Sequence, residues 1–126
     1  MSTPLGLEFS LRPGCLMVSV QGRQIVENKA AIIQQIADTM REYHVRAALL
    51  TTHAVPGPLS FMDRFQLGTL AGRYLSGMSI GVLARPDQAD PQKIGQLVAK
   101  NRGVAVEVFT DPAAAEAWVK QHAPKA

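Results

Sequence analysis

A set of polar side chains that could recognise an anion is spread over the middle of the chain. They follow predicted strands or begin predicted helices, and they are Thr51, Thr52, His53, Ser60, Asp63, Arg64, Arg85 and Asp87. In open α/β sheets, ligands favour the crevice at the carboxyl ends of parallel strands, where helix N-termini converge. Arginines and helix N-termini at that rim suit a small anionic ligand. The candidate binding surface is therefore Thr52, His53, Ser60, Asp63, Arg64 and Arg85.

His53 is the residue of this set with the chemistry of a general base. Asp63 or Asp87 could orient its ring, as in an enzyme acting on a small anionic substrate. No nucleophile stands at a recognisable spacing from them, so we assign no catalytic residue. A simpler interpretation stays open, in which Ser60 and Asp63 cap a helix while His53 and its neighbours satisfy loop backbone groups.

Residues with metal-binding or redox chemistry are few and scattered. His44, His53 and His122 have no spacing typical of a metal site. Cys15 is the only cysteine, which excludes an internal disulfide and a zinc site built on cysteines. We expect Cys15 to be a buried hydrophobic residue in a strand, and we expect no metal and no cofactor.

Four glycines in the stretch FQLGTLAGRYLSGMSIG, residues 65–81, raise the question of a phosphate-binding loop. Such a loop follows a strand, opens a helix and carries a lysine. Here a predicted helix runs into a strand, and Met78 and Ser79 stand where the lysine and hydroxyl residue would be. The glycines are instead predicted to serve packing, two on one helix face, one at a helix end and one in a crowded strand: Gly68, Gly72, Gly77 and Gly81.

The elements that position these residues follow from hydrophobic periodicity. Residues 7–22 alternate apolar and polar side chains around Pro13 and Gly14, which predicts a β-hairpin. Strands and helices then alternate, with helices beginning near residues 26, 61, 91 and 112 and strands at about 45–52, 78–84 and 104–109. The order ββαβαβαβα predicts one α/β domain with its core at about 7–122, a mixed, mostly parallel five-stranded sheet and about four helices.

Capping residues and apolar stripes define the predicted helices. The first runs over about 26–43, with Tyr43 closing its apolar face. The second begins at Ser60, and Asp63 completes a variant of the capping box. The third has Asp90 as its cap, Pro91 at its first position and Gly103 after its end. Its predicted buried stripe is Ile94, Leu97 and Val98.

Composition excludes several classes of protein. The chain has 126 residues, 47% of them hydrophobic, and its net charge of +3 is spread without a basic run. We therefore expect no nucleic-acid partner. No apolar stretch approaches the roughly 20 residues that span a bilayer, so we expect no integral membrane segment. The opening MSTPLGLEFS lacks the pattern of a secretory signal, which makes a cytoplasmic location the default expectation.

The element order and the motifs FMDRFQLG, SIGVLARP, NRGVAVEVFTD and AAAEAWV resemble the SpoIIAA-like family, whose members are described as STAS-like or CRAL-TRIO-like domains. The resemblance covers residues 7–119 and implies a small non-enzymatic domain. Relatives among the anti-sigma factor antagonists bind a protein kinase and are switched by phosphorylation of a serine that follows an Asp. The corresponding position here is Ser60, which follows Leu59 instead. The lipid-transport side of the resemblance implies an apolar pocket.

The resulting hypothesis is a non-enzymatic binding or regulatory module. Its partner would be another protein or a second copy of the chain, bound at the sheet edge or at the surface around residues 53–64. One alternative is a carrier of a small apolar or amphipathic ligand. A second alternative is an enzyme that acts on a small anionic substrate at the rim of the sheet.

Overall fold

Alternating side chains at the start of the chain form an antiparallel hairpin. In the computed structural model, which describes residues 4–57, 59–89 and 93–123, β1 (Leu7–Arg12) pairs with β2 (Cys15–Gln21). Gly14 takes a φ of 72° in the turn, which a side chain would strain. Leu7 and Val20 face each other across the pair, and both are fully buried. The predicted hairpin is confirmed.

Three parallel strands extend the hairpin into a mixed sheet. They are β3 (Ala47–Ala54), β4 (Ser79–Leu83) and β5 (Ala105–Phe109), and the spatial order is β1-β2-β3-β4-β5. β2 pairs parallel with β3, β3 with β4 and β4 with β5. The carboxyl ends of β2 to β5 therefore meet at one rim of the sheet, as the candidate site requires.

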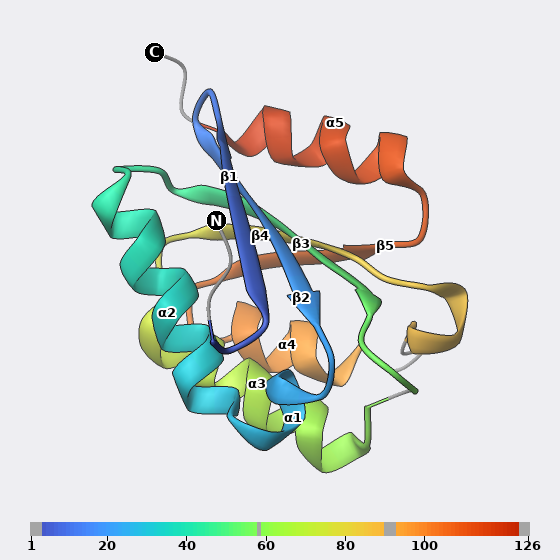
Figure 1. Ribbon diagram of the computed structural model, residues 1–126. Coiled ribbons are helices and arrows are strands. Elements are labelled where there is room, and N and C mark those ends of the chain that lie inside the picture. Colours follow the sequence, from blue (N-terminus) through green and yellow to red (C-terminus); the bar gives the residue numbers. More distant parts are fainter. Residues whose placement is uncertain (1–3, 58, 90–92, 124–126) are drawn as a thin grey trace.

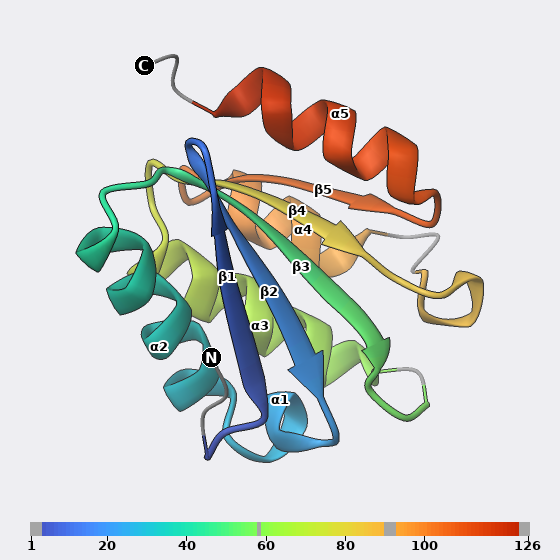
Figure 2. The same ribbon diagram turned by 45° about the horizontal axis from the view of Figure 1, so that its top comes forward.

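Helices cover both faces of this sheet unequally. The helices are α1 (Gln24–Glu27), α2 (Lys29–Glu42), α3 (Phe61–Tyr74), α4 (Ile94–Lys100) and α5 (Pro112–His122), and a 3₁₀ turn, η1 (Pro86–Gln88), follows β4. Figure 1 shows α1 to α4 together on one face and α5 alone on the other. The view in Figure 2 shows the same two layers about the twisted sheet. α3 packs between α2 and α4, at the centre of the larger layer.

The strand β3 is buried on both faces because helices cover it on both sides. Ala48 and Leu50 belong to the larger core, under α2 to α4. Ala47 and Leu49 point to the opposite side and join the smaller core under α5. This placement explains why the sequence of β3 is nearly continuous in apolar residues.

The helix expected over residues 26–43 is two helices, so the described chain has five α-helices rather than about four. Asn28 separates α1 from α2, with φ −134° and ψ 50°. Its side-chain amide donates a hydrogen bond to the Gln24 side chain across the break. Tyr43, expected on the buried face, lies beyond the end of α2 and is exposed.

The face that helix α4 presents to the core matches the predicted stripe of Ile94, Leu97 and Val98 only in part. Ile94 and Val98 are half-buried, but Leu97 is 51% exposed, so its placement in the stripe is wrong, and Gln96 and Ala99 are buried instead. α4 begins at Ile94, after Lys93. The predicted cap and proline at positions 90 and 91 lie outside the described residues.

The glycines of residues 65–81 have the packing roles expected of them. A Cβ added to Gly68 would meet the backbone of α4, and one added to Gly72 would meet the side chain of Arg102. Gly77 follows the end of α3 with a φ of 82°. Gly81 lies in β4 directly under α5. A helix precedes a strand here, so this segment does not have the architecture of a phosphate loop.

Candidate functional site

The start of α3 is fixed by the capping box predicted from the sequence. The backbone N–H of Asp63 donates to Ser60 Oγ over 3.1 Å, and the backbone N–H of Ser60 donates to Asp63 Oδ2 over 3.3 Å. Each side chain thus satisfies a backbone donor that the helix itself cannot pair. Ser60 is exposed despite this role, so its hydroxyl can be reached from solvent.

Asp63 also joins α3 to α2 through an ion pair. Lys29 Nζ lies 2.9 Å from Asp63 Oδ1, and both side chains are largely shielded from solvent. Lys29 additionally donates to the carbonyl of Val26 over 3.0 Å. The hydrogen bond from Lys29, together with weaker ones from Ser60, holds the pKa of Asp63 below its usual range. Asp63 is therefore an ionised, structurally engaged carboxylate.

A second cluster, the strand-end network, joins the carboxyl ends of β3 and β4 through Thr52, Arg85, Asp87 and Gln88. Gln88 Nε2 donates to the carbonyls of Thr52 and Val55 over 2.9 and 3.0 Å. Gln88 Oε1 accepts from Thr52 Oγ1 over 3.0 Å and from the backbone N–H of Arg85 over 2.9 Å. One glutamine thus uses both ends of its amide to hold the two strand ends together.

All three guanidinium nitrogens of Arg85 donate hydrogen bonds within this network. Its Nε and Nη2 donate to the two carboxylate oxygens of Asp87 over 3.0 and 3.3 Å, and its Nη1 donates to the carbonyl of His53. The hydrogen bond from Arg85 lowers the pKa of Asp87. Arg85 therefore holds the backbone at the rim of the sheet, and its guanidinium is already paired with the carboxylate of Asp87.

The structure does not assemble His53 with a carboxylate as an acid–base pair. Asp63 is paired with Lys29 and Asp87 with Arg85, so each of the two expected partners is held by a cation. The His53 side chain is exposed, and its backbone carbonyl is what enters the strand-end network. This geometry favours the structural interpretation of Asp63 and Asp87.

Beside Ser60, α3 exposes three large apolar side chains, which we call the α3 face. Phe61 is 56% exposed, Met62 55% and Phe65 41%. The rings of Phe61 and Phe65 stack with their centroids 6.5 Å apart. Phe65 also lines a shallow groove between α3 and the helices α1 and α2, whose other apolar residues are Val26, Ala30 and Leu70.

A cavity of about 190 Å³ lies between the sheet and the helix layer, and we call it the helix-sheet cavity. Its floor is made by the inward side chains of β3, β4 and β5, and its roof by α3 and α4. Nearly all of this lining is apolar. At the rim of the sheet the lining becomes polar, with Thr52, Arg64, Gln88 and Lys93. Of the candidate surface, Thr52 and Arg64 thus also border the cavity.

Gln96 is the polar side chain that the sequence analysis did not find. It is 7% exposed, it lines the helix-sheet cavity, and its Oε1 has no hydrogen-bond partner among the described residues. A signal was present, because Gly95 and Ala99 have the same four-residue spacing as Gly68 and Gly72. Small residues at that spacing mark the face of α4 that approaches α3, and Gln96 lies beside them.

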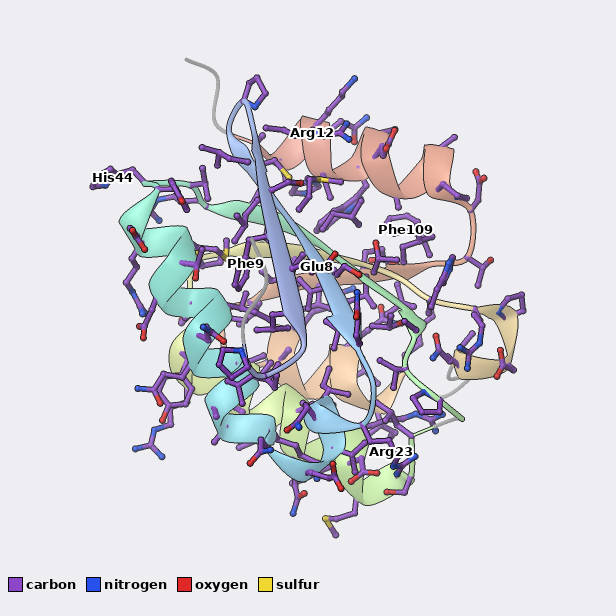
Figure 3. All side chains as sticks on the ribbon, in the orientation of Figure 1. Glu8, Phe9, Arg12, Arg23, His44 and Phe109 are labelled. Carbon is purple, nitrogen blue, oxygen red and sulfur yellow. The ribbon has the colours of Figure 1, made fainter. Side chains whose placement is uncertain are left out.

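The other candidate groups lie apart from one another. Burial raises the pKa of the Cys15 thiol, as expected for a buried residue in a strand. The His122 ring stacks on Trp118 in α5, at 4.0 Å between centroids. Figure 3 shows His44 at the far end of the molecule from Arg23, which bonds the carbonyl of Pro56 in the loop after β3.

Two structural absences can be stated for residues 4–57, 59–89 and 93–123. No three side chains among their histidines, cysteines, aspartates and glutamates are grouped so that they could hold a metal ion. In the same residues, every helix is too short or too polar to cross a bilayer.

Comparison with solved structures identifies the class of fold. The chain is similar to an anti-sigma factor antagonist from Mycobacterium paratuberculosis, with a TM-score of 0.59 and 16% identity over 95% of this chain and 99% of that chain. It is also similar to an uncharacterised protein of the DUF3478 family with a SpoIIAA-like fold from Shewanella loihica PV-4, with a TM-score of 0.52 and 18% identity over 94% and 98% of the two chains. The chain therefore has a SpoIIAA-like fold, which confirms the structural part of the resemblance. No family model and no curated protein matches the sequence.

Proposed function

We propose that this chain is a regulatory module that acts by binding another protein at the surface around the start of α3. The observation that carries the proposal is the α3 face, where Phe61, Met62 and Phe65 are each about half exposed beside Ser60. Large apolar side chains that are exposed as a group mark interaction surfaces. Aromatic residues and methionine are also enriched at the centres of protein interfaces.

The partner we propose is a different protein that presents an apolar ridge to the groove between α3 and the helices α1 and α2. Phe65 and Leu70 would line one wall of this contact and Val26 the other. The similar protein from Mycobacterium paratuberculosis is described as an antagonist of an anti-sigma factor, a name that implies action on another protein. This similarity supports a heterologous partner over a second copy of the chain.

The rim residues have two different roles in this proposal. His53 and Ser60 have exposed side chains and would contact the partner. Thr52 and Arg85 hold the strand ends through hydrogen bonds, and Asp63 holds α3 to α2. These three residues would shape the surface, while Arg64 would add positive charge at its border.

Ser60 is the position at which phosphorylation would regulate such a surface. A phosphate there would lie at the positive end of α3 and near Lys29, both of which favour a negative group. It would also face the ionised carboxylate of Asp63, which opposes it. The exposed Ser60 hydroxyl supports regulation at this site. Because the phosphate and the Asp63 carboxylate would repel each other, we expect phosphorylation to break the capping hydrogen bonds between Ser60 and Asp63.

The decisive experiment compares the α3 face with an exposed apolar residue elsewhere on the molecule. Wild-type protein, a Phe61→Ala/Phe65→Ala variant and a Leu11→Ala variant are used to capture partners from native lysate, and the captured protein is then purified for titration. Leu11 is a matched control because it is 52% exposed and lies on β1. We expect the α3 variant to bind about thirtyfold or more weakly, as loss of an interface centre implies, and the control to bind within about twofold of wild type.

Other outcomes would contradict this proposal. If a purified partner bound the α3 variant as tightly as it binds the wild type, the α3 face would not be the binding surface. Sedimentation that shows a dimer dissociated by the α3 substitutions would replace the heterologous partner with a second copy. A His53→Ala/Arg64→Ala variant should lose capture while staying folded, and unchanged capture would exclude the rim residues.

A further inference from the structure

We propose that the helix-sheet cavity binds a small, mainly apolar molecule carrying one hydrogen-bond donor, and that Gln96 Oε1 accepts this hydrogen bond. The inference is independent of the proposed function, because it concerns the interior of the helix layer and not its outer face. Two observations carry it together: an apolar space of about 190 Å³, and a buried acceptor without a partner on Gln96, one of the residues that line this space.

The cavity exists because small residues form its roof. Gly68 and Ala71 on α3, and Gly95 and Ala99 on α4, all line it. Their size lets the two helices approach each other closely, and it leaves a space that the neighbouring Leu67 and Leu75 line but do not fill. Larger residues such as Leu97 point away from the cavity. The close helix contact and the empty space therefore have one cause.

Gln96 makes this space different from an ordinary packing defect. A buried amide oxygen without a hydrogen bond costs roughly 1–3 kcal/mol, so native structures rarely leave one unpaired. The Gln96 side chain is more than nine-tenths buried, and its Oε1 has no partner in the described part of the chain. An O–H or N–H donor on a bound molecule would satisfy it once the Gln96 amide turns its oxygen toward the cavity.

Size and polarity define the class of ligand. The volume slightly exceeds the roughly 150 Å³ of an engineered apolar cavity that binds benzene. A ligand somewhat larger than one aromatic ring would therefore fill it. A single water molecule would pair with Gln96 but would leave most of the apolar wall without contacts. A phenol, an indole or an aliphatic alcohol of similar size fits both the space and the acceptor.

The test uses phenol and toluene, which have nearly the same shape but differ in the donor. Both are titrated by ligand-observed NMR into wild-type protein and into Gln96→Met, which keeps the side-chain length and removes the acceptor. We expect Gln96→Met to weaken phenol binding about tenfold and to leave toluene binding unchanged or tighter. Gln35→Met is the matched control, because Gln35 also has a buried, unpartnered Oε1 but does not line the cavity; it should change neither affinity.

A second variant locates the site independently of hydrogen bonding. Ala71→Met extends a flexible apolar side chain into the cavity and should abolish binding of both molecules while the circular dichroism spectrum stays native. Should Ala71→Met not fold, the contrast between Gln96→Met and Gln35→Met alone decides. The proposal is overturned if wild-type protein binds neither molecule at millimolar concentration. It is also overturned if Gln96→Met leaves the ratio of the two affinities unchanged, or if folded Ala71→Met still binds both.

Discussion

Gly68 and Gly95 bring α3 and α4 into backbone contact: a Cβ placed on Gly68 would lie 2.6 Å from the carbonyl oxygen of Gly95. The reverse approach is nearly as close, since a Cβ on Gly95 would lie 3.2 Å from the carbonyl oxygen of Arg64. α3 carries the capping serine and the α3 face, and together with α4 it roofs the cavity. One contact between glycines therefore sets the position of both candidate sites.

Gly68→Ala should destabilise the protein although alanine is the better helix former. The gain in helix propensity is up to about 1 kcal/mol, and overpacking against a backbone that cannot yield costs about 1–3 kcal/mol. We expect a net loss of roughly 1 kcal/mol in the free energy of unfolding, measured by urea denaturation. Thr69→Ala, on the next residue of α3, should be neutral or stabilising. A Gly68→Ala protein as stable as Thr69→Ala would show that the helices separate freely.

Gln88→Leu should loosen the carboxyl ends of β3 and β4. It removes the hydrogen bonds to the carbonyls of Thr52 and Val55 and the acceptor for the Arg85 backbone N–H. Because these groups are partly buried, we expect a loss of about 2 kcal/mol in the free energy of unfolding. Gln34→Leu, at an exposed position of α2, is the control and should change stability by less than about 0.5 kcal/mol. If Gln88→Leu and Gln34→Leu changed stability equally, water would be replacing the hydrogen bonds of Gln88.

The ion pair between Lys29 and Asp63 predicts a pH dependence on the acid side. The pKa of Asp63 lies below its ordinary value of 3.8 in the folded protein, so its contribution is fully present above that value. The contribution is lost as pH falls through the lower folded pKa. Lys29→Met should reduce the free energy of unfolding by about 0.5–1 kcal/mol at pH 7. The curves of variant and wild type should then converge as the pH falls below 3.8.

A control for this prediction removes a lysine from a different ion pair. Lys100 pairs with Glu107 at 3.4 Å, and both side chains are more exposed than those of Lys29 and Asp63. Lys100→Met should therefore shift stability less at pH 7. Parallel curves for Lys29→Met and wild type over the whole acid range would contradict a coupled Asp63.

Ser60 should affect stability and binding through separable effects. Ser60→Ala removes the acceptor for the Asp63 backbone N–H and should cost about 1 kcal/mol of folding stability. Ser60→Asp keeps an N-cap acceptor and should cost less, although its carboxylate would face Asp63. If the α3 surface is regulated by charge, Ser60→Asp should weaken partner binding at least tenfold while Ser60→Ala changes it little. Equal binding by both variants would argue against such regulation.

The sequence by itself determined the order of the elements and several local contacts. The alternation of apolar and polar residues predicted the hairpin, and the capping pattern of Ser60 and Asp63 predicted the start of α3 correctly. These signals are local, because a turn or a cap depends on residues within about four positions of each other. The four glycines of residues 65–81 were also interpreted correctly, since a glycine inside a helix or strand indicates that something packs closely against it.

Only the tertiary structure decided which groups meet across elements. Nothing near Asp63 in the chain indicates Lys29 as its partner, and nothing near Thr52 indicates Gln88. The buried face of α4 was predicted only in part, because the contact with Gly68 is made by Gly95 and Val98, and this orientation of the helix leaves Leu97 exposed. The helix-sheet cavity depends on side chains from at least five elements, and its volume is what remains after all of them have packed. No single stretch of sequence can therefore indicate that this cavity exists.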